Sequence, residues 1–119
     1  MKILYFGNPY LKEDNLAIKI CEKLKNELKN IEFRQIKDTF QLVDEKLDDS
    51  IIIDTIKGLN KVKEIKPEQI EQGNIASLHD FDLGFFLKLK KTRARIIGIP
   101  QNYNEENALK EVKSILRTG

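Results

Sequence analysis

The sequence predicts a single α/β domain, a three-layer sandwich in which a mainly parallel five-stranded sheet carries helices on both faces. Short aliphatic runs alternate with stretches of helical period along the chain. The run Ser50–Thr55 is β-branched almost throughout, which is typical of a central parallel strand covered on both faces. A chain of 119 residues has room for one hydrophobic core, so we expect one domain over residues 1–119.

The first part of the chain predicts two strands and two helices around that central strand. Lys2–Gly7 is a buried strand that stops at Gly-Asn-Pro. Apolar residues recur every three or four positions over Asn15–Leu28, which predicts an amphipathic helix. Ile31–Ile36 alternates apolar and polar residues, so we expect a half-exposed strand near a sheet edge. A short helix is predicted over Thr39–Leu47.

The second part predicts two more strands and two more helices. Asn60–Lys66 alternates and then meets a proline, which favours an edge strand, possibly an antiparallel one. Glu68–Ser77 is a polar connection, and a helix follows over Leu83–Lys90. Arg93–Pro100 is a buried strand, and Asn104–Leu116 places its apolar residues on one helical stripe. Strands that alternate with helices imply right-handed crossovers and a mainly parallel sheet.

Composition excludes several classes of protein. The 21 basic and 19 acidic residues give a net charge of +2, so no strong field favours nucleic acid or an anionic membrane surface. The single cysteine, Cys21, excludes an intramolecular disulfide and fits a reducing cytoplasm. No apolar run reaches the length of a membrane span or of a secretory signal. We therefore expect a cytoplasmic monomer with neither a nucleic-acid nor a membrane partner.

The function of such a sheet is expected outside the carboxyl ends of its strands, where the strand order reverses. Glu13 and Asp14 follow the first predicted strand, and Asp54 closes the buried run of isoleucines. In the common order that places the first and third strands side by side, Asp14 and Asp54 overhang the same edge. Two carboxylates then converge.

Each candidate residue also has a purely structural interpretation. Glu13 or Asp14 could cap the first turn of the following helix. Asp54 stands directly after three isoleucines, where desolvation is costly, so it requires either a partner or a function. His79, the single histidine, is on its own more typical of a loop residue. Cys21 falls on the inner stripe of a helix, which favours packing over nucleophilic chemistry.

Two kinds of site can be set aside from the residue types alone. Only Gly7 follows the first strand, so a glycine-rich phosphate loop is disfavoured there. A zinc site built from several histidines or cysteines is excluded by the presence of one of each. A mixed site of two carboxylates and one imidazole is still feasible, and it could hold a borderline divalent ion such as nickel or zinc.

Four motifs, in the same order, resemble the endopeptidases that mature nickel-iron hydrogenases. They span nearly the whole chain and read KILYFGNPYLKEDNLAIKICEKL, IIIDTI, SLHDFDL and RARIIGIPQ. In that family they correspond to the first strand with its acidic loop and helix, the aliphatic strand ending in Asp, the Ser-x-His loop and the last strand. The segment after the second predicted strand, IKDTFQLVDEKL, lacks the glycines that are usual in the family.

The resemblance implies a peptidase that removes the C-terminal extension of a nickel-iron hydrogenase large-subunit precursor after nickel insertion. It assigns Asp14, Asp54 and His79 as the catalytic and metal-contacting residues, with Glu13 as the reserve candidate. The nickel then belongs to the substrate precursor, and the three side chains recognise the occupied centre. Zinc or cadmium could occupy the site in its absence. The implied partner is the precursor protein itself.

Two other functions stay open on the residues alone. A non-proteolytic doubly wound domain, similar in layout to flavodoxin-like receivers, would use the acidic strand ends for metal binding or regulation. Such a pocket does not require His79, and it normally has a lysine at the end of a later strand, where this chain reads IIGIPQ. A structural protein without any site would tolerate alanine at Asp14, Asp54 and His79 with no change in activity or binding.

Overall fold

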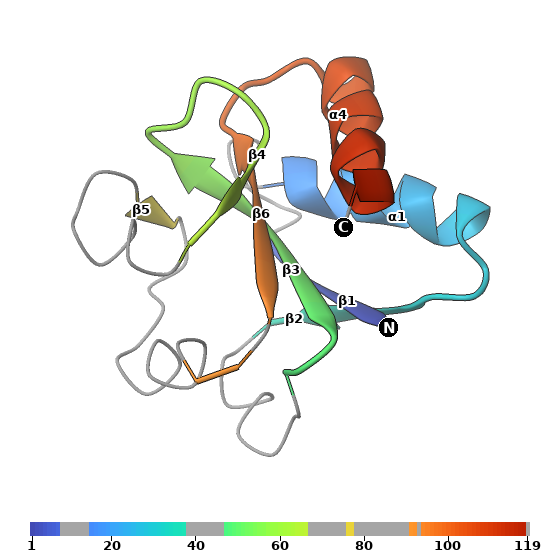
Figure 1. The fold of residues 1–119 in the computed structure, drawn as a ribbon. Coiled ribbons are helices and arrows are strands. Elements are labelled where there is room, and N and C mark those ends of the chain that lie inside the picture. Colours follow the sequence, from blue (N-terminus) through green and yellow to red (C-terminus); the bar gives the residue numbers. More distant parts are fainter. Residues whose placement is uncertain (8–14, 38–46, 67–75, 78–90, 93, 119) are drawn as a thin grey trace.

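The computed structural model of the chain shows a mixed β-sheet with two helices packed against it (Figure 1). It describes residues 1–7, 15–37, 47–66, 76–77, 91–92 and 94–118. The elements, in chain order, are β1 (Lys2–Phe6), α1 (Leu16–Glu27), β2 (Glu32–Ile36), β3 (Ser50–Lys57), β4 (Lys63–Ile65), β5 (Ala76–Ser77), β6 (Arg95–Pro100) and α4 (Glu105–Thr118).

The strand order confirms the predicted α/β sheet. The main path is β2-β1-β3-β6-β4, and the pairs β1–β2, β1–β3 and β3–β6 are all parallel. The edge strand β4 runs antiparallel to β6, as its alternating sequence before a proline suggested. The five predicted strands are therefore all present, with β3 at the centre and β2 at the opposite edge from β4.

The sheet buries a separate hydrophobic cluster on each face, because consecutive residues of a strand point to opposite sides. On one face α1 and α4 pack together against β1, β3 and β6, and Figure 1 shows both helices on the same side of the strands. The buried strand residues of this helix-covered face are Ile3, Tyr5, Ile51, Ile53, Ile97 and Ile99. Those of the opposite face are Leu4, Phe6, Ile36, Ile52, Ile56, Ile65 and Ile96.

The two described helices follow their predicted stripes. In α1 the buried residues are Leu16, Ala17, Ile18, Ile20, Cys21 and Leu24. In α4 the buried residues are Ala108 and Val112, and Leu109, Ile115 and Leu116 are half-buried against the same cluster. Ion pairs from Lys23 to Glu105 and from Lys113 to Glu27 join the two helices at their surface. The predicted helix layer on the opposite face falls on residues 39–46 and 83–90, outside the described residues.

The structure corrects three predicted boundaries, two of them near the predicted site. We expected Asp54 to close its strand, but β3 continues to Lys57 because β6 and β5 supply further ladder partners there. We also expected a polar connection up to Ser77, but Ala76 and Ser77 form the short strand β5. Leu47, the last residue of a predicted helix, is buried against the opposite face and is not helical.

Candidate functional site

The strand order reverses between β1 and β3, so the carboxyl ends of these two strands form the expected ligand edge. From β1 the chain passes through α1, on the helix-covered face, to β2 at the sheet edge. The next strand, β3, lies on the other side of β1. Leu47, just before β3, packs in the cluster of the opposite face. The one described connection around this point, α1, thus crosses one face, and the chain enters β3 from the other.

Asp54 lies at this edge and is fully buried, with 0% exposure. Its register partner on β6 is Gly98, and the ladder between β1 and β3 ends one residue earlier, at the pair Tyr5–Ile53. Because side chains alternate along a strand, Asp54 shares its face with Ile52 and Ile56. The carboxylate therefore sits on the face opposite α1, among apolar side chains, where an ionised group is costly to bury without compensation.

Thr55, the next residue, faces the helix-covered side and holds the start of α1. Its Oγ1 atom accepts a hydrogen bond of 3.3 Å from the buried Ala17 N–H. Ala17 belongs to the first turn of α1, whose N–H groups have no partner within the helix. The N-terminus of α1 is thus fixed to the strand residue that adjoins Asp54.

The short strand β5 also reaches this edge. It runs antiparallel to β3, with Ser77 paired to Ile56 and Ala76 paired to Lys57. One side of β3 is already occupied by β6, whose residue Pro100 is the register partner of Ile56. β5 therefore lies on the other side of β3, beyond the point where the ladder with β1 ends.

Two glycines shape the surroundings of Asp54. Gly7 directly follows β1 with φ of 153°, a conformation that side-chain-bearing residues rarely adopt, so it redirects the chain where the strand ends. At Gly98 an added Cβ would lie 2.6 Å from Leu59 Cδ1 and 3.1 Å from Ile56 Cδ1, and it would also clash with Ile65 Cδ1. The strand beside Asp54 can therefore carry no side chain on this face at position 98.

Of the predicted site residues, the structure places Asp54 alone. Glu13, Asp14 and His79 lie outside the described residues. The N-cap position of α1 is taken by Asn15, not by Glu13 or Asp14, although the Asn15 side chain makes no capping hydrogen bond. Among the described residues no group of three or more His, Cys, Asp or Glu side chains comes together as a metal site.

Two contributors to this edge, Thr55 and β5, have no local signal in the sequence. Thr55 follows Asp54 in an aliphatic run, and nothing local signals that its hydroxyl is used by a helix 38 residues away in sequence. β5 has two residues, too few to show any periodicity.

Burial raises the pKa of two groups on the helix-covered face, Tyr5 and Cys21. Burial raises the pKa of Tyr5, whose hydroxyl donates a 3.1 Å hydrogen bond to Glu22 Oε1, and the Glu22 carboxylate raises it further. Burial also raises the pKa of the Cys21 thiol well above its usual range. A thiol held protonated is a poor nucleophile and metal ligand. The packing role predicted for Cys21 is confirmed by its complete burial.

The sheet order and the position of Asp54 define an α/β domain with a buried acidic residue at its strand-order reversal. A solved structure similar to this chain is that of an uncharacterized protein from Wolinella succinogenes, which is 12% identical, with a TM-score of 0.63. The match covers 98% of this chain and 96% of that one, and at this identity it shows the fold alone. No family model and no curated protein matches the chain. Neither described helix is long and apolar enough to cross a membrane.

Proposed function

We propose that this protein is an endopeptidase that removes the C-terminal extension of a nickel-iron hydrogenase large-subunit precursor after nickel insertion. The observation that carries the proposal is the complete burial of Asp54 at the reversal of strand order. A carboxylate this deeply buried must be paired or hydrogen-bonded to offset its desolvation, and such arrangements are common at functional sites. The resemblance of the four sequence motifs supplies the reaction.

The described parts of the chain next to the other two candidates also support a shared site. Ser77, two residues before His79 in sequence, pairs with Ile56, two residues after Asp54. Ala17, three residues after Asp14, donates to Thr55, the residue after Asp54. Because Asn15 takes the cap position of α1, the preference for acidic caps does not by itself call for an acidic residue at position 14.

In this proposal the protein recognises its substrate through the substrate's own metal ion. Asp54, Asp14 and His79 supply an incomplete set of oxygen and nitrogen ligands, and the nickel of a loaded precursor completes it. An empty precursor has no ion to offer, so it is discriminated against. The same ion is suited to polarise the scissile carbonyl or a water molecule as a Lewis acid.

The experiment is a processing assay with nickel-loaded and nickel-free precursor from the same organism. We expect a shortened large subunit only with the loaded precursor. Asp54→Asn, which keeps the shape of the side chain and removes its charge, should lower processing at least about tenfold to a hundredfold, the loss that follows even from mutating a residue that supports a metal ligand. His79→Ala should have a comparable effect.

The matched control is Asp49→Asn, the same chemical change at an exposed carboxylate that directly precedes β3. Its side chain is 82% exposed, and asparagine tolerates the positive φ of 61° at this position. This variant should process like the wild type. Full processing by Asp54→Asn, with an unchanged urea midpoint, would remove Asp54 from the site.

A second candidate function is metal binding or regulation without cleavage. The order β2-β1-β3, shared with flavodoxin-like domains, favours it, because such sheets bind ligands at this same edge without peptidase chemistry. Under this alternative, calorimetry with nickel or zinc detects a site that Asp54→Asn abolishes, while every precursor stays uncut. Processing of a loaded precursor decides for the peptidase.

A further inference from the structure

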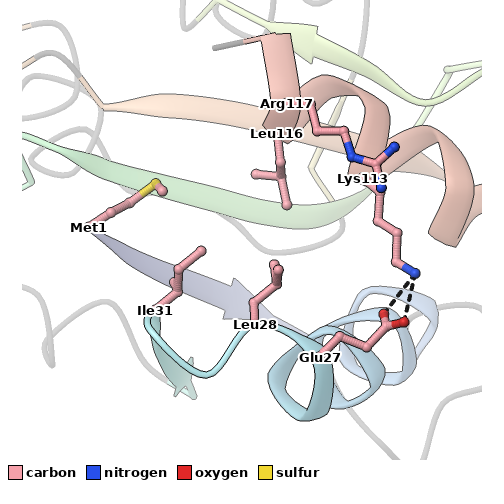
Figure 2. Close-up of a pocket in the computed structure, with 7 residues that line it drawn as sticks. All are labelled: Met1, Glu27, Leu28, Ile31, Lys113, Leu116 and Arg117. Atoms are coloured by element: carbon pink, nitrogen blue, oxygen red, sulfur yellow. Dashed lines mark hydrogen bonds and ion pairs between the residues drawn. The ribbon is translucent and has the colours of Figure 1, made fainter.

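A pocket of about 280 Å³ opens near the amino ends of β1 and β3, whereas Asp54 lies near their carboxyl ends. It lies between the end of α1, the end of α4 and the residue before β1, and Figure 2 shows its lining side chains. Lys2, next to the pocket residue Met1, pairs with Ser50, four residues before Asp54 on β3. At about 3.3 Å per residue the two regions are about 13 Å apart along the strand. The pocket is therefore separate from the candidate functional site.

The inner wall of the pocket is aliphatic. Leu116 points from α4 toward Leu28 and Ile31, and all three side chains are half-buried against the core of the helix-covered face (Figure 2). Met1 completes the wall, and it is 56% exposed. Methionine is flexible and polarizable, so it can adjust to the shape of a bound apolar group.

Two cations of α4 lie at the polar side of the pocket. Lys113 and Arg117 are one turn apart on α4, so their like charges face the same side of the helix. Lys113 is neutralised by Glu27, whose two carboxylate oxygens each lie 2.8 Å from its Nζ atom (Figure 2). Within the part of the chain that the structure describes, Arg117 forms no ion pair. Its guanidinium is suited to bind a carboxylate through two parallel hydrogen bonds.

The volume limits the size of an occupant. At about 30 Å³ per molecule, 280 Å³ corresponds to roughly nine waters, and the aliphatic wall offers them no hydrogen bond. Displacing such waters with an apolar group is favourable. An occupant of similar volume has about ten non-hydrogen atoms, fewer than most drug-sized ligands.

We infer that this pocket, lined by Met1, Leu28, Ile31 and Leu116 with Arg117 at its polar side, binds a small amphipathic carboxylate. The aliphatic body fills the hollow between α1, α4 and β1, and the carboxylate pairs with Arg117. A medium-chain fatty acid has this chemistry and size. The competing explanation of Arg117 is that a cation in the last turn complements the dipole of α4, which requires no ligand.

The test is titration of the full chain with octanoate, followed by calorimetry and by amide chemical shifts. We expect saturable binding that shifts the amides of Leu28, Ile31 and Leu116. Arg117→Gln should weaken octanoate binding at least about tenfold, since a hydrogen bond to a charged group is lost. Lys110→Gln, an equal charge change at an exposed position of α4 outside the pocket, should leave the affinity unchanged.

Two ligand controls separate the apolar body from the charged head. Acetate lacks the body and 1-octanol lacks the charge, and each should bind at least tenfold more weakly than octanoate. The inference is overturned if 1-octanol binds as tightly as octanoate, if Arg117→Gln binds octanoate like the wild type, or if no saturable binding occurs. It is also overturned if sedimentation shows a dimer that Leu116→Asp dissociates, because a second copy then covers the pocket. Unfolding midpoints of the variants verify that each is folded.

Discussion

At the scale of single residues, Thr55 connects the sheet to a helix beside the candidate site. A local residue usually satisfies the first N–H groups of a helix, but in α1 the buried Ala17 N–H donates to Thr55 Oγ1 instead. Thr55 is itself fully buried. The acceptor for this helix N–H therefore comes from a residue that is remote in sequence. The contact fixes the beginning of α1 relative to β3.

Thr55→Val tests this contact, because valine keeps the shape of threonine and lacks the hydroxyl. The buried Ala17 N–H then has no acceptor, and we expect a loss of about 1–3 kcal/mol in the free energy of unfolding, measured by urea titration. Thr55→Ser, which keeps the hydroxyl, should lose less. Equal stability of Thr55→Val and the wild type would show that the hydrogen bond contributes nothing.

The sequence identified Asp54 as a candidate because a carboxylate directly follows three isoleucines. Alternation along the strand also determines the face that it occupies, so this part of the site was predictable. The role of Thr55 was not, because its partner is remote in sequence and the hydroxyl has no local signature. The assignments of Asp14 and His79 stay predictions, since both fall outside the described residues.

At the scale of elements, periodicity predicted the strands and helices that bury one face or one stripe. Each pattern depends only on which side chains of one element are buried. This holds for the alternation in β2, the isoleucine run of β3 and the apolar stripes of α1 and α4. The end of β3 depends instead on which strands lie beside it. Ladder partners from β5 and β6 extend β3 to Lys57, and no residue within the strand specifies them.

The close packing of β4 on β6 depends on Gly98. Gly98→Ala places a methyl group against the Cδ1 atoms of Ile65 and Leu59, and overpacking of this kind costs about 1–3 kcal/mol. We expect the urea midpoint to fall accordingly. Because Ile65→Val removes the Cδ1 atom on β4, the double variant should recover part of that loss.

The matched control for this rescue is Ile97→Val, which removes the same atom from a residue on the helix-covered face. Combined with Gly98→Ala, it should add its own cost and recover nothing. If both double variants show the same additive losses, the clash with Ile65 is not the cause of the destabilisation.

At the scale of the whole molecule, stability should depend on pH in the alkaline range. The pKa values of Tyr5 and Cys21 are raised by burial, so the unfolded chain loses these protons at a lower pH than the folded one. Keeping Tyr5 and Cys21 protonated contributes to the free energy of unfolding. This contribution is fully present below the pKa values of the unfolded chain, near 8.5 for cysteine and 10 for tyrosine. It is lost as the pH rises through the pKa values of the folded chain.

Tyr5→Phe isolates the tyrosine contribution to this dependence. The free energy of unfolding of the wild type should fall with pH above about 10, and each titrating group contributes at most about 1.4 kcal/mol per pH unit. The variant should show a shallower decline over the same range, measured by urea titration from pH 7 to 11. Identical slopes for the variant and the wild type would contradict a raised pKa at Tyr5.

The central position of β3 has a consequence for synthesis of the chain. One side of this strand pairs with β1, from the beginning of the sequence, and the other with β6, from near its end. As the chain leaves the ribosome, β1, α1 and β2 can associate early, but β3 keeps one row of backbone N–H and C=O groups unpaired until Pro100 has emerged. An unpaired strand side of this kind is a template for aggregation, so a nascent chain stalled before Arg95 is the form of this protein that most requires a chaperone.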